Sequence, residues 1–157
     1  MTMQRARFPR RGLLGGASVA AALLTAIGYA NAPAGRYTTS TMNGVDVVLD
    51  TRTQLTWQRS PGMTSVTWLQ AQNACATLGV GWRLPSVEEL ETIVDETIPP
   101  PGPTIDSTFA ALAVCYWTLT PLPNPGMPPF TTAWCVDFLD GRQRLDQTTM
   151  NLVRCVR

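Results

Sequence analysis

Apolar and polar residues alternate along residues 45–58 in a pattern that predicts a β-hairpin. Two apolar runs flank residues 50–53, whose polar composition is typical of a turn. Side chains two positions apart on a strand point to the same side, so Leu55 and Trp57 should share one face of the second strand. Large aromatic residues in a small domain are usually buried, and we expect this face to meet the core.

Three later segments also have the composition of strands. Residues 114–120 are aromatic and β-branched, which favours extended structure. Residues 132–146 predict a second hairpin, with Asp140 and Gly141 as the pair at its turn. Residues 152–157 are expected to form a terminal strand.

Residues 67–79 show helical spacing instead. Thr67 and Gln70 are three residues apart, as in a capping box, and Gly79 favours a left-handed stop. The apolar positions lie three or four residues apart: Trp68, Ala71, Cys75 and Leu78. This pattern predicts an amphipathic helix with one face in the core.

A second helix is predicted directly after Pro85. Ser86 and Glu89 have the spacing of another capping box, and the prolines at 99–101 mark an abrupt end. Its apolar face would be formed by Val87, Leu90, Ile93 and Val94. A hairpin, two helices and several antiparallel strands, in that order, indicate an α+β domain.

The amino-terminal part has the pattern of an export signal. A basic start is followed by an uncharged apolar stretch over 12–28 and then by small residues. We expect residues 1–34 to be a signal peptide cleaved near residues 32–34, which leaves no stable membrane span. Arg10 and Arg11 fit a twin-arginine signal, and the general secretory route stays open. The protein is thus expected in the periplasm, at the cell surface or secreted.

The charge balance excludes several classes of function. The chain has 12 arginines, no lysine and no histidine. Loss of the four arginines among residues 1–11 leaves eight against 11 acids, a net charge of −3. A nucleic-acid partner is not expected from this balance. The lack of histidine removes the commonest general base and metal ligand, and we expect no metal, no cofactor and no catalytic residue.

Four cysteines lie in the expected mature part, at positions 75, 115, 135 and 155. Their spacings of forty, twenty and twenty residues do not fit a zinc site. An even number of well-spaced cysteines in an exported chain predicts two disulfides. Spacing alone leaves three connectivities open.

A set of short motifs resembles a known family. LTWQ, a cysteine-bearing helix, WRLPSVEEL, YWT, AWCVDFLDG and VRCVR occur in that order over roughly residues 45–157. This order is similar to that of the Lcl C-terminal domain family, named for the last domain of a bacterial collagen-like adhesin. The resemblance implies a domain over residues 37–157 with a C-type lectin-like fold, in which two helices pack on short antiparallel strands.

The resemblance also implies a disulfide pairing. In lectin-like domains the first helix is tied to the last strand, which corresponds here to Cys75 and Cys155. Cys115 and Cys135 would then form a second disulfide nested inside the first. Formylglycine-generating enzymes share the broader fold but use paired free thiols, whereas these four cysteines are better explained as disulfides.

Candidate site residues flank the proline-rich loop at residues 121–130. Trp117 and Trp134 lie on either side of it and Asn124 lies within it, and we take these three as the candidate ligand contacts. The loop segment LPNPGM lacks the acid of a calcium-dependent sugar site. A structural role is expected for Trp82, Arg83 and Glu89. Arg83 should form a buried salt bridge to an acid in or near the second helix, with the acids of the strands as further partners.

Three classes of function compete. We favour a non-catalytic binding or adhesion module that recognises a glycan or an extracellular protein, because lectin-like scaffolds vary in their long loops and a proline-stiffened loop loses less entropy on binding. The second class is an enzyme, either related to the formylglycine-generating enzymes or a hydrolase. Candidate carboxylates for the hydrolase are Asp106, Asp137, Asp140 and Asp146. The third class is a structural domain that associates with copies of itself, and the sequence leaves the oligomeric state open.

Overall fold

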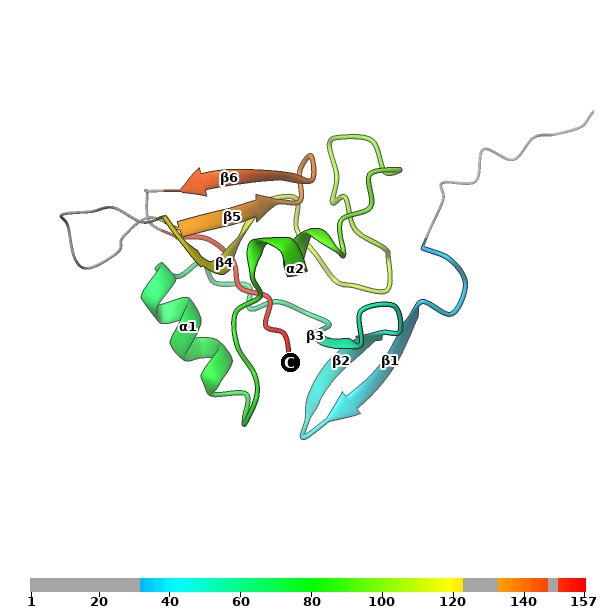
Figure 1. The fold of residues 1–157 in the computed structure, drawn as a ribbon, viewed down its shortest axis with the longest axis horizontal. Coiled ribbons are helices and arrows are strands. Elements are labelled where there is room, and N and C mark those ends of the chain that lie inside the picture. The colour runs from blue at the N-terminus through cyan, green and yellow to red at the C-terminus, as the bar shows by residue number, and fades with distance from the viewer. Residues whose placement is uncertain (1–31, 123–132, 147–149) are drawn as a thin grey trace, which may run out of the picture.

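The structure, a computed structural model, describes residues 32–122, 133–146 and 150–157. It confirms the predicted α+β class, with two helices, two three-stranded antiparallel sheets and two disulfides (Figure 1). The elements in chain order are β1 (Tyr37–Met42), β2 (Val45–Asp50), β3 (Leu55–Gln58), α1 (Trp68–Ala76), α2 (Val87–Glu91), β4 (Cys115–Pro121), β5 (Ala133–Asp137) and β6 (Arg142–Asp146).

The first sheet has the order β1-β2-β3, so the predicted hairpin β2–β3 gains an outer strand that the apolar pattern did not indicate. β1 pairs with β2 from Tyr37 opposite Asp50 to Met42 opposite Val45. The turn between them is Asn43-Gly44, with φ of 50° and 79° at the two residues. Two positive φ angles define the type I′ turn whose twist matches that of a hairpin.

The second sheet has the order β4-β5-β6 and contains the predicted hairpin over 132–146. Its turn includes Asp140 and Gly141, as expected, and Gly141 has φ of 75°. At one end of β4 and β5, next to the Asp140-Gly141 turn, Cys115 lies opposite Asp137. At the other end Pro121 lies opposite Ala133, and the register is irregular in between. The ends of these two strands therefore lie side by side where the proline-rich segment leaves the sheet.

Both helices begin where the capping boxes predict. The Thr67 side chain accepts a hydrogen bond from the Gln70 N–H, and the Ser86 side chain accepts one from the Glu89 N–H. α2 is shorter than expected, because it ends at Glu91. After Glu91 the chain leaves the helix, and Val94 forms an extended β-bridge with Ile105. A further helical turn would break this bridge.

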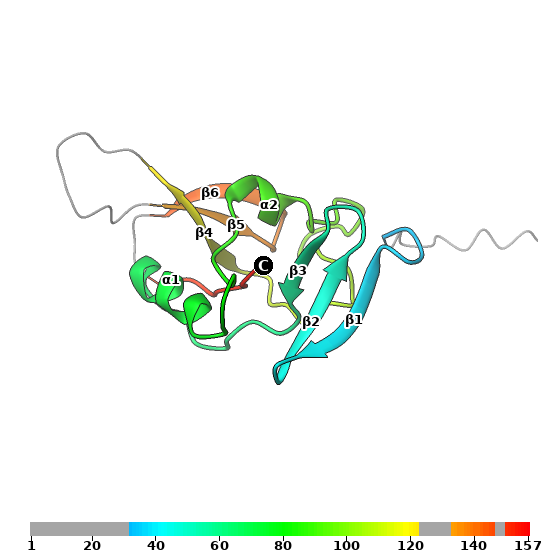
Figure 2. The ribbon, with the colours of Figure 1, turned by 60° about the horizontal axis from the view of Figure 1, so that its bottom comes forward.

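The carboxy-terminal segment does not form the regular strand that we expected over 152–157. It makes single bridges to three separate parts of the chain, at Trp57, Arg83 and Tyr116. Figures 1 and 2 show this segment, in red, running through the middle of the molecule between the two sheets. It exchanges partners along its length, and no run of pairs with a single neighbour is long enough to make a strand.

Two apolar clusters form the core. One joins the first sheet, α2 and the second sheet around Trp57, Leu90 and Tyr116. The other surrounds both disulfides, which link Cys75 to Cys155 and Cys115 to Cys135. This is the pairing that the family resemblance implied. Within the described ranges, no helix is long and apolar enough to cross a membrane.

Candidate functional site

Trp117, one of the three predicted ligand contacts beside the loop, is buried. This side chain is 1% exposed, and its indole N–H donates a 2.8 Å hydrogen bond to the Val66 carbonyl. Its ring belongs to the core cluster around the disulfides, so it offers no face to a ligand. The expected ligand contact at Trp117 is therefore corrected to a core role, while Asn124 lies outside the described residues.

Trp134, on β5, is only partly buried and lies next to the end of the predicted loop. It stands directly opposite Leu145 of β6, a residue that is 45% exposed. Directly opposed residues share one face of a sheet, so the two side chains form an apolar pair. Sequence reasoning missed Leu145, although an apolar residue among the polar residues of 142–146 was a usable signal.

The strand that carries Trp134 is cross-linked to its other neighbour, β4. Cys115 and Cys135 join β4 to β5, and the Thr118 hydroxyl donates a 2.7 Å hydrogen bond to the Trp134 carbonyl. The main chain beside Trp134 is thus fixed by a covalent bond and by a side-chain contact from the neighbouring strand. A surface held in this way keeps its geometry when a ligand binds.

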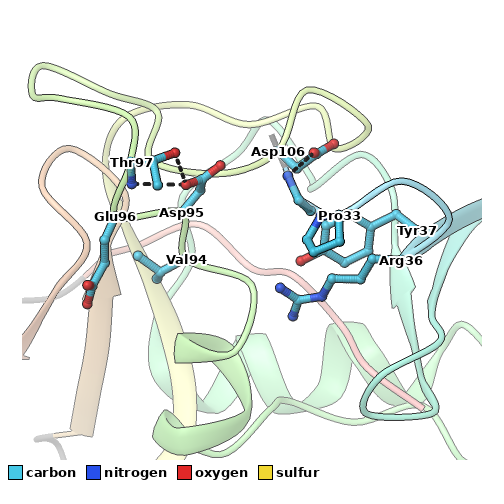
Figure 3. A pocket seen from close by; sticks show the side chains of 9 residues that line it. Pro33, Arg36, Tyr37, Val94, Asp95, Glu96, Thr97 and Asp106 are labelled. Carbon is cyan, nitrogen blue, oxygen red and sulfur yellow. Dashed lines mark hydrogen bonds between the residues drawn. The ribbon is translucent and has the colours of Figure 1, made fainter. Parts of the chain in front are cut away.

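The described residues also form a pocket of about 440 Å³ beside the amino-terminal end of β1 (Figure 3). The lining comes from the segment before β1, from β1 itself and from the loop after α2: Ala32, Pro33, Arg36, Tyr37, Val94, Asp95, Glu96, Thr97 and Asp106. Three of these residues are acids and one is an arginine, which gives the pocket an acidic lining.

The arginine of the pocket is already paired. Arg36 donates two hydrogen bonds to the carboxylate of buried Asp50, at 3.2 and 2.9 Å, and one to the Thr92 carbonyl at 2.6 Å. The bond to Asp50 raises the pKa of Arg36 further above its usual value. Burial raises the pKa of neighbouring Tyr37 to about 12, so its hydroxyl stays neutral at physiological pH.

The carboxylates of the pocket are also engaged. Asp106 accepts hydrogen bonds from the Thr108 N–H at 2.8 Å and from the Ala32 N–H at 3.3 Å. Oδ1 of Asp95 accepts from Thr97, while Oδ2 of Asp95 is buried without a hydrogen-bond partner among the described residues. The polar groups of this pocket thus fasten the segment around Ala32 to the body of the domain. Within the described ranges, no three potential metal ligands cluster.

The four aspartates proposed for a hydrolase are used in separate contacts. Asp137 and Asp140 both accept hydrogen bonds from Arg144, each at 2.8 Å. Asp146 accepts one from Asn151, and Asp106 lines the pocket beside β1. Two of the four carboxylates therefore share a cation on a surface turn.

Comparison with known proteins identifies the family of this sequence. The sequence profile of the Lcl C-terminal domain matches residues 46–157, most of the chain. The chain belongs to the Lcl C-terminal domain family. No curated protein matches it. Among solved structures it is similar to botrocetin, with a TM-score of 0.42 and 10% sequence identity over 81% of this chain and 98% of that one.

In this Lcl C-terminal domain, the arginine of the WRLP motif is not buried. Arg83 makes two 2.7 Å hydrogen bonds to Glu89, the expected partner, but the side chains are 43% and 25% exposed. The expectation of a buried salt bridge is therefore wrong. Trp82 and Leu84 point into the core, and the extended main chain turns the intervening side chain outward. Arg83 also bridges to Val156 through its main chain.

The buried arginine of the Lcl C-terminal domain is Arg154, in the closing VRCVR motif. Its side chain has no exposed surface and donates to the main-chain carbonyls of Gln58, Arg59 and Ala110, at 2.6 to 2.8 Å. The guanidinium also lies over the rings of two aromatic residues, Phe109 and Tyr116. Burial lowers the pKa of Arg154 to about 10, so it is still charged at neutral pH. Sequence reasoning missed this role.

Proposed function

We propose that the protein is an exported, non-catalytic binding module, and that its ligand is a neutral glycan or an extracellular protein. The observation that carries this proposal is the disulfide-linked strand pair β4–β5, which holds the two ends of the proline-rich segment beside the pair formed by partly buried Trp134 and exposed Leu145. Membership in a family named for an adhesin domain supports a binding role.

The chemistry of the surface favours recognition by contact with apolar faces. An indole ring buries a large area at little entropic cost and stacks on the apolar face of a sugar or on a protein side chain. Trp134 and Leu145 supply such an area, and Asn124 in the adjoining segment supplies an amide that both donates and accepts hydrogen bonds. Removal of the expected signal peptide would leave a net charge of −3 without lysine, which disfavours polyanionic ligands.

The pocket beside β1 is a weaker candidate for the binding site. Arg36 is neutralised by Asp50, and Asp106 accepts a hydrogen bond from the Thr108 N–H, a contact that does not depend on the residues removed with the signal peptide. A ligand in this pocket would have to displace contacts that hold the amino-terminal segment in place, at a cost in folding free energy.

An array of glycans and matrix proteins tests the proposal. The purified protein should bind a subset of the array, with binding unchanged by EDTA. Leu145→Ser, and replacement of residues 122–129 by a Gly/Ser segment, should each weaken that binding at least about tenfold, as for contacts near the centre of an interface. Val80→Ser is the matched control, because Val80 is highly exposed and lies in a different part of the chain.

Three results would contradict the proposal. Binding that survives replacement of residues 122–129 would move the site elsewhere. Loss of binding in EDTA would show that a metal ion takes part. Turnover of an arrayed substrate that is lost in Asp137→Asn or Asp106→Asn would assign the protein to the enzymes instead.

A further inference from the structure

β1 forms an open edge of the first sheet. It pairs with β2 on one side, and among the described residues no backbone group pairs with it on the other. Figure 2 shows β1 as the outermost strand of its sheet. Four consecutive residues, 38–41, are exposed, so both faces of the strand meet solvent. A strand that buries so little against its own domain obtains little stability from it.

The hairpin geometry identifies the groups that face the open edge. In a hairpin with a two-residue turn, the flanking residues Met42 and Val45 exchange both main-chain hydrogen bonds, and bonded and non-bonded pairs then alternate along the strands. Tyr37, Thr39 and Thr41 fall in the non-bonded pairs. Their N–H and C=O groups therefore point away from β2 and toward the open edge.

The two sheets differ in how their open edges are protected. The outer strand of the second sheet, β6, carries Arg142, Arg144 and Asp146, and charges on an edge prevent pairing with another chain. β1 has the sequence YTTSTM, with no charge, no proline and no glycine. Three of its six residues are threonines, which favour extended structure and form cross-strand pairs. Of these two edge strands, β6 carries charges that prevent pairing with another chain, and β1 has no such feature.

We propose that β1 pairs antiparallel with β1 of a second copy of the chain, about a two-fold axis near Thr39. In this register Thr39 faces its own copy, and Tyr37 faces Thr41 in both directions. All three residues with outward main-chain groups then form bonded pairs. The two first sheets join into one six-stranded sheet, as a symmetric, self-complementary interface requires.

The chemistry of the strand favours a second copy over an unrelated partner. Antiparallel self-pairing of YTTSTM places hydroxyl and aromatic side chains opposite one another and places no charge opposite a like charge. The same operation on β6 would align a strand that carries two arginines with itself. The interface is separate from the Trp134–Leu145 surface, so its test is independent of the ligand proposed above.

Sedimentation velocity of the purified protein, with its amino terminus defined by mass spectrometry, tests this interface. The wild-type protein should form dimers as its concentration rises from low micromolar toward millimolar. Thr39→Lys and Thr39→Glu should each raise the dimer dissociation constant at least about tenfold, because like charges then meet at the axis. An equimolar mixture of the two variants should dimerise again, since opposite charges face each other.

Controls separate this interface from effects on the fold. Gln143→Lys on the exposed edge strand β6 should dimerise like the wild type. Thr39 is exposed, and the melting temperature of its variants in dilute solution should equal that of the wild type. A wild-type protein that stays monomeric at every concentration overturns the proposal. So does a dimer that persists in Thr39→Lys, or a mixture of the charged variants that fails to restore pairing.

Discussion

Single residues show how differently two arginines of one chain contribute to stability. Arg83 shares its charge with water and with one carboxylate. Arg154 has no contact with water, and within the described ranges it forms no salt bridge with an acid. Its charge is balanced by three carbonyl dipoles and by two aromatic rings instead. Two of these carbonyls are adjacent, at Gln58 and Arg59 where β3 ends, and the third is in the loop before β4, so one side chain joins the carboxy-terminal segment to two others.

The two arginines should therefore respond unequally to the same substitution. Arg154→Met removes a donor from three main-chain carbonyls, of which that of Arg59 keeps the Ala110 N–H, and should lower the free energy of unfolding by about 2–4 kcal/mol. Arg83→Met removes a solvent-screened ion pair and a 3.1 Å hydrogen bond to the Leu84 carbonyl, and should cost about 1 kcal/mol or less. Urea denaturation of both variants measures the difference. An equal loss in the two, or a larger loss in Arg83→Met, would contradict the roles assigned here.

At the scale of elements, α2 shows how five residues are kept helical. The Glu89 carboxylate accepts a hydrogen bond from the Ser86 N–H at 2.8 Å and closes the capping box. The same carboxylate holds both terminal nitrogens of Arg83. The first turn of α2 is thus joined to the WRLP segment by one side chain. So short a helix has little stability of its own and depends on these contacts and on buried Leu90.

Substitutions at Glu89 should separate these two contributions. Glu89→Gln keeps an acceptor for the cap and should cost less than about 1 kcal/mol, whereas Glu89→Ala loses both contacts and should cost about 1–2 kcal/mol. The hydrogen bond from Arg83 lowers the pKa of Glu89. The ion pair therefore stabilises the fold above the ordinary pKa of 4.5, and this contribution is lost as pH falls through the lower folded-state value.

The melting temperature measured between neutral and acidic pH checks this sign. The difference between wild type and Glu89→Gln should be constant near neutrality and should shrink as pH falls below the ordinary glutamate pKa. A difference that grows on acidification would show that Arg83 does not act through the ionised form of Glu89.

Elements with a local signal were predictable, and those fixed by distant contacts were not. The capping boxes located the start of both helices, because side chain and main-chain partner lie three residues apart. The end of α2 was not predicted, because the helix stops where Val94 bridges to Ile105, which is remote in sequence. β1 lacks apolar alternation, although Asn43-Gly44 was an available hairpin signal.

In the molecule as a whole, two disulfides cross-link the chain, and they enclose loops of very different length. Cys75 and Cys155 are 80 residues apart and join α1 to the carboxy-terminal segment, while Cys115 and Cys135 are 20 apart and join neighbouring strands. The chain-entropy account predicts a larger stabilisation for the longer loop, because its closure removes more conformations from the unfolded chain.

Paired substitutions measure each link separately. Replacing Cys75 and Cys155 by alanine should lower the free energy of unfolding by about 4–5 kcal/mol, and replacing Cys115 and Cys135 should lower it by about 3 kcal/mol. Denaturant titration of the two double variants gives the comparison. Thiol titration of the denatured wild type should find no free cysteine, as the structure indicates. A larger loss from the shorter link would show that local strand packing, rather than chain entropy, dominates.

The sequence predicted only some residues of the candidate site. Residues 121–130 were recognised from their prolines, and Trp134 from its place beside them. Burial of Trp117 depends on how the second sheet packs on α1 and the carboxy-terminal segment, which no local pattern records. Arg154 was missed for the same reason, since its acceptors lie 44 to 96 residues away in the sequence.

Residues 152–157 lie between the two sheets and pair with each in turn. A ribosome makes the chain from its amino terminus, so the segment that occupies the centre is produced after everything that surrounds it. Before these residues are synthesised, Trp57 and Tyr116 lack their bridge partners in this segment, and Cys75 lacks Cys155 as its disulfide partner. A chain that lacks residues 152–157 would hold all eight helices and strands described above and still expose its centre.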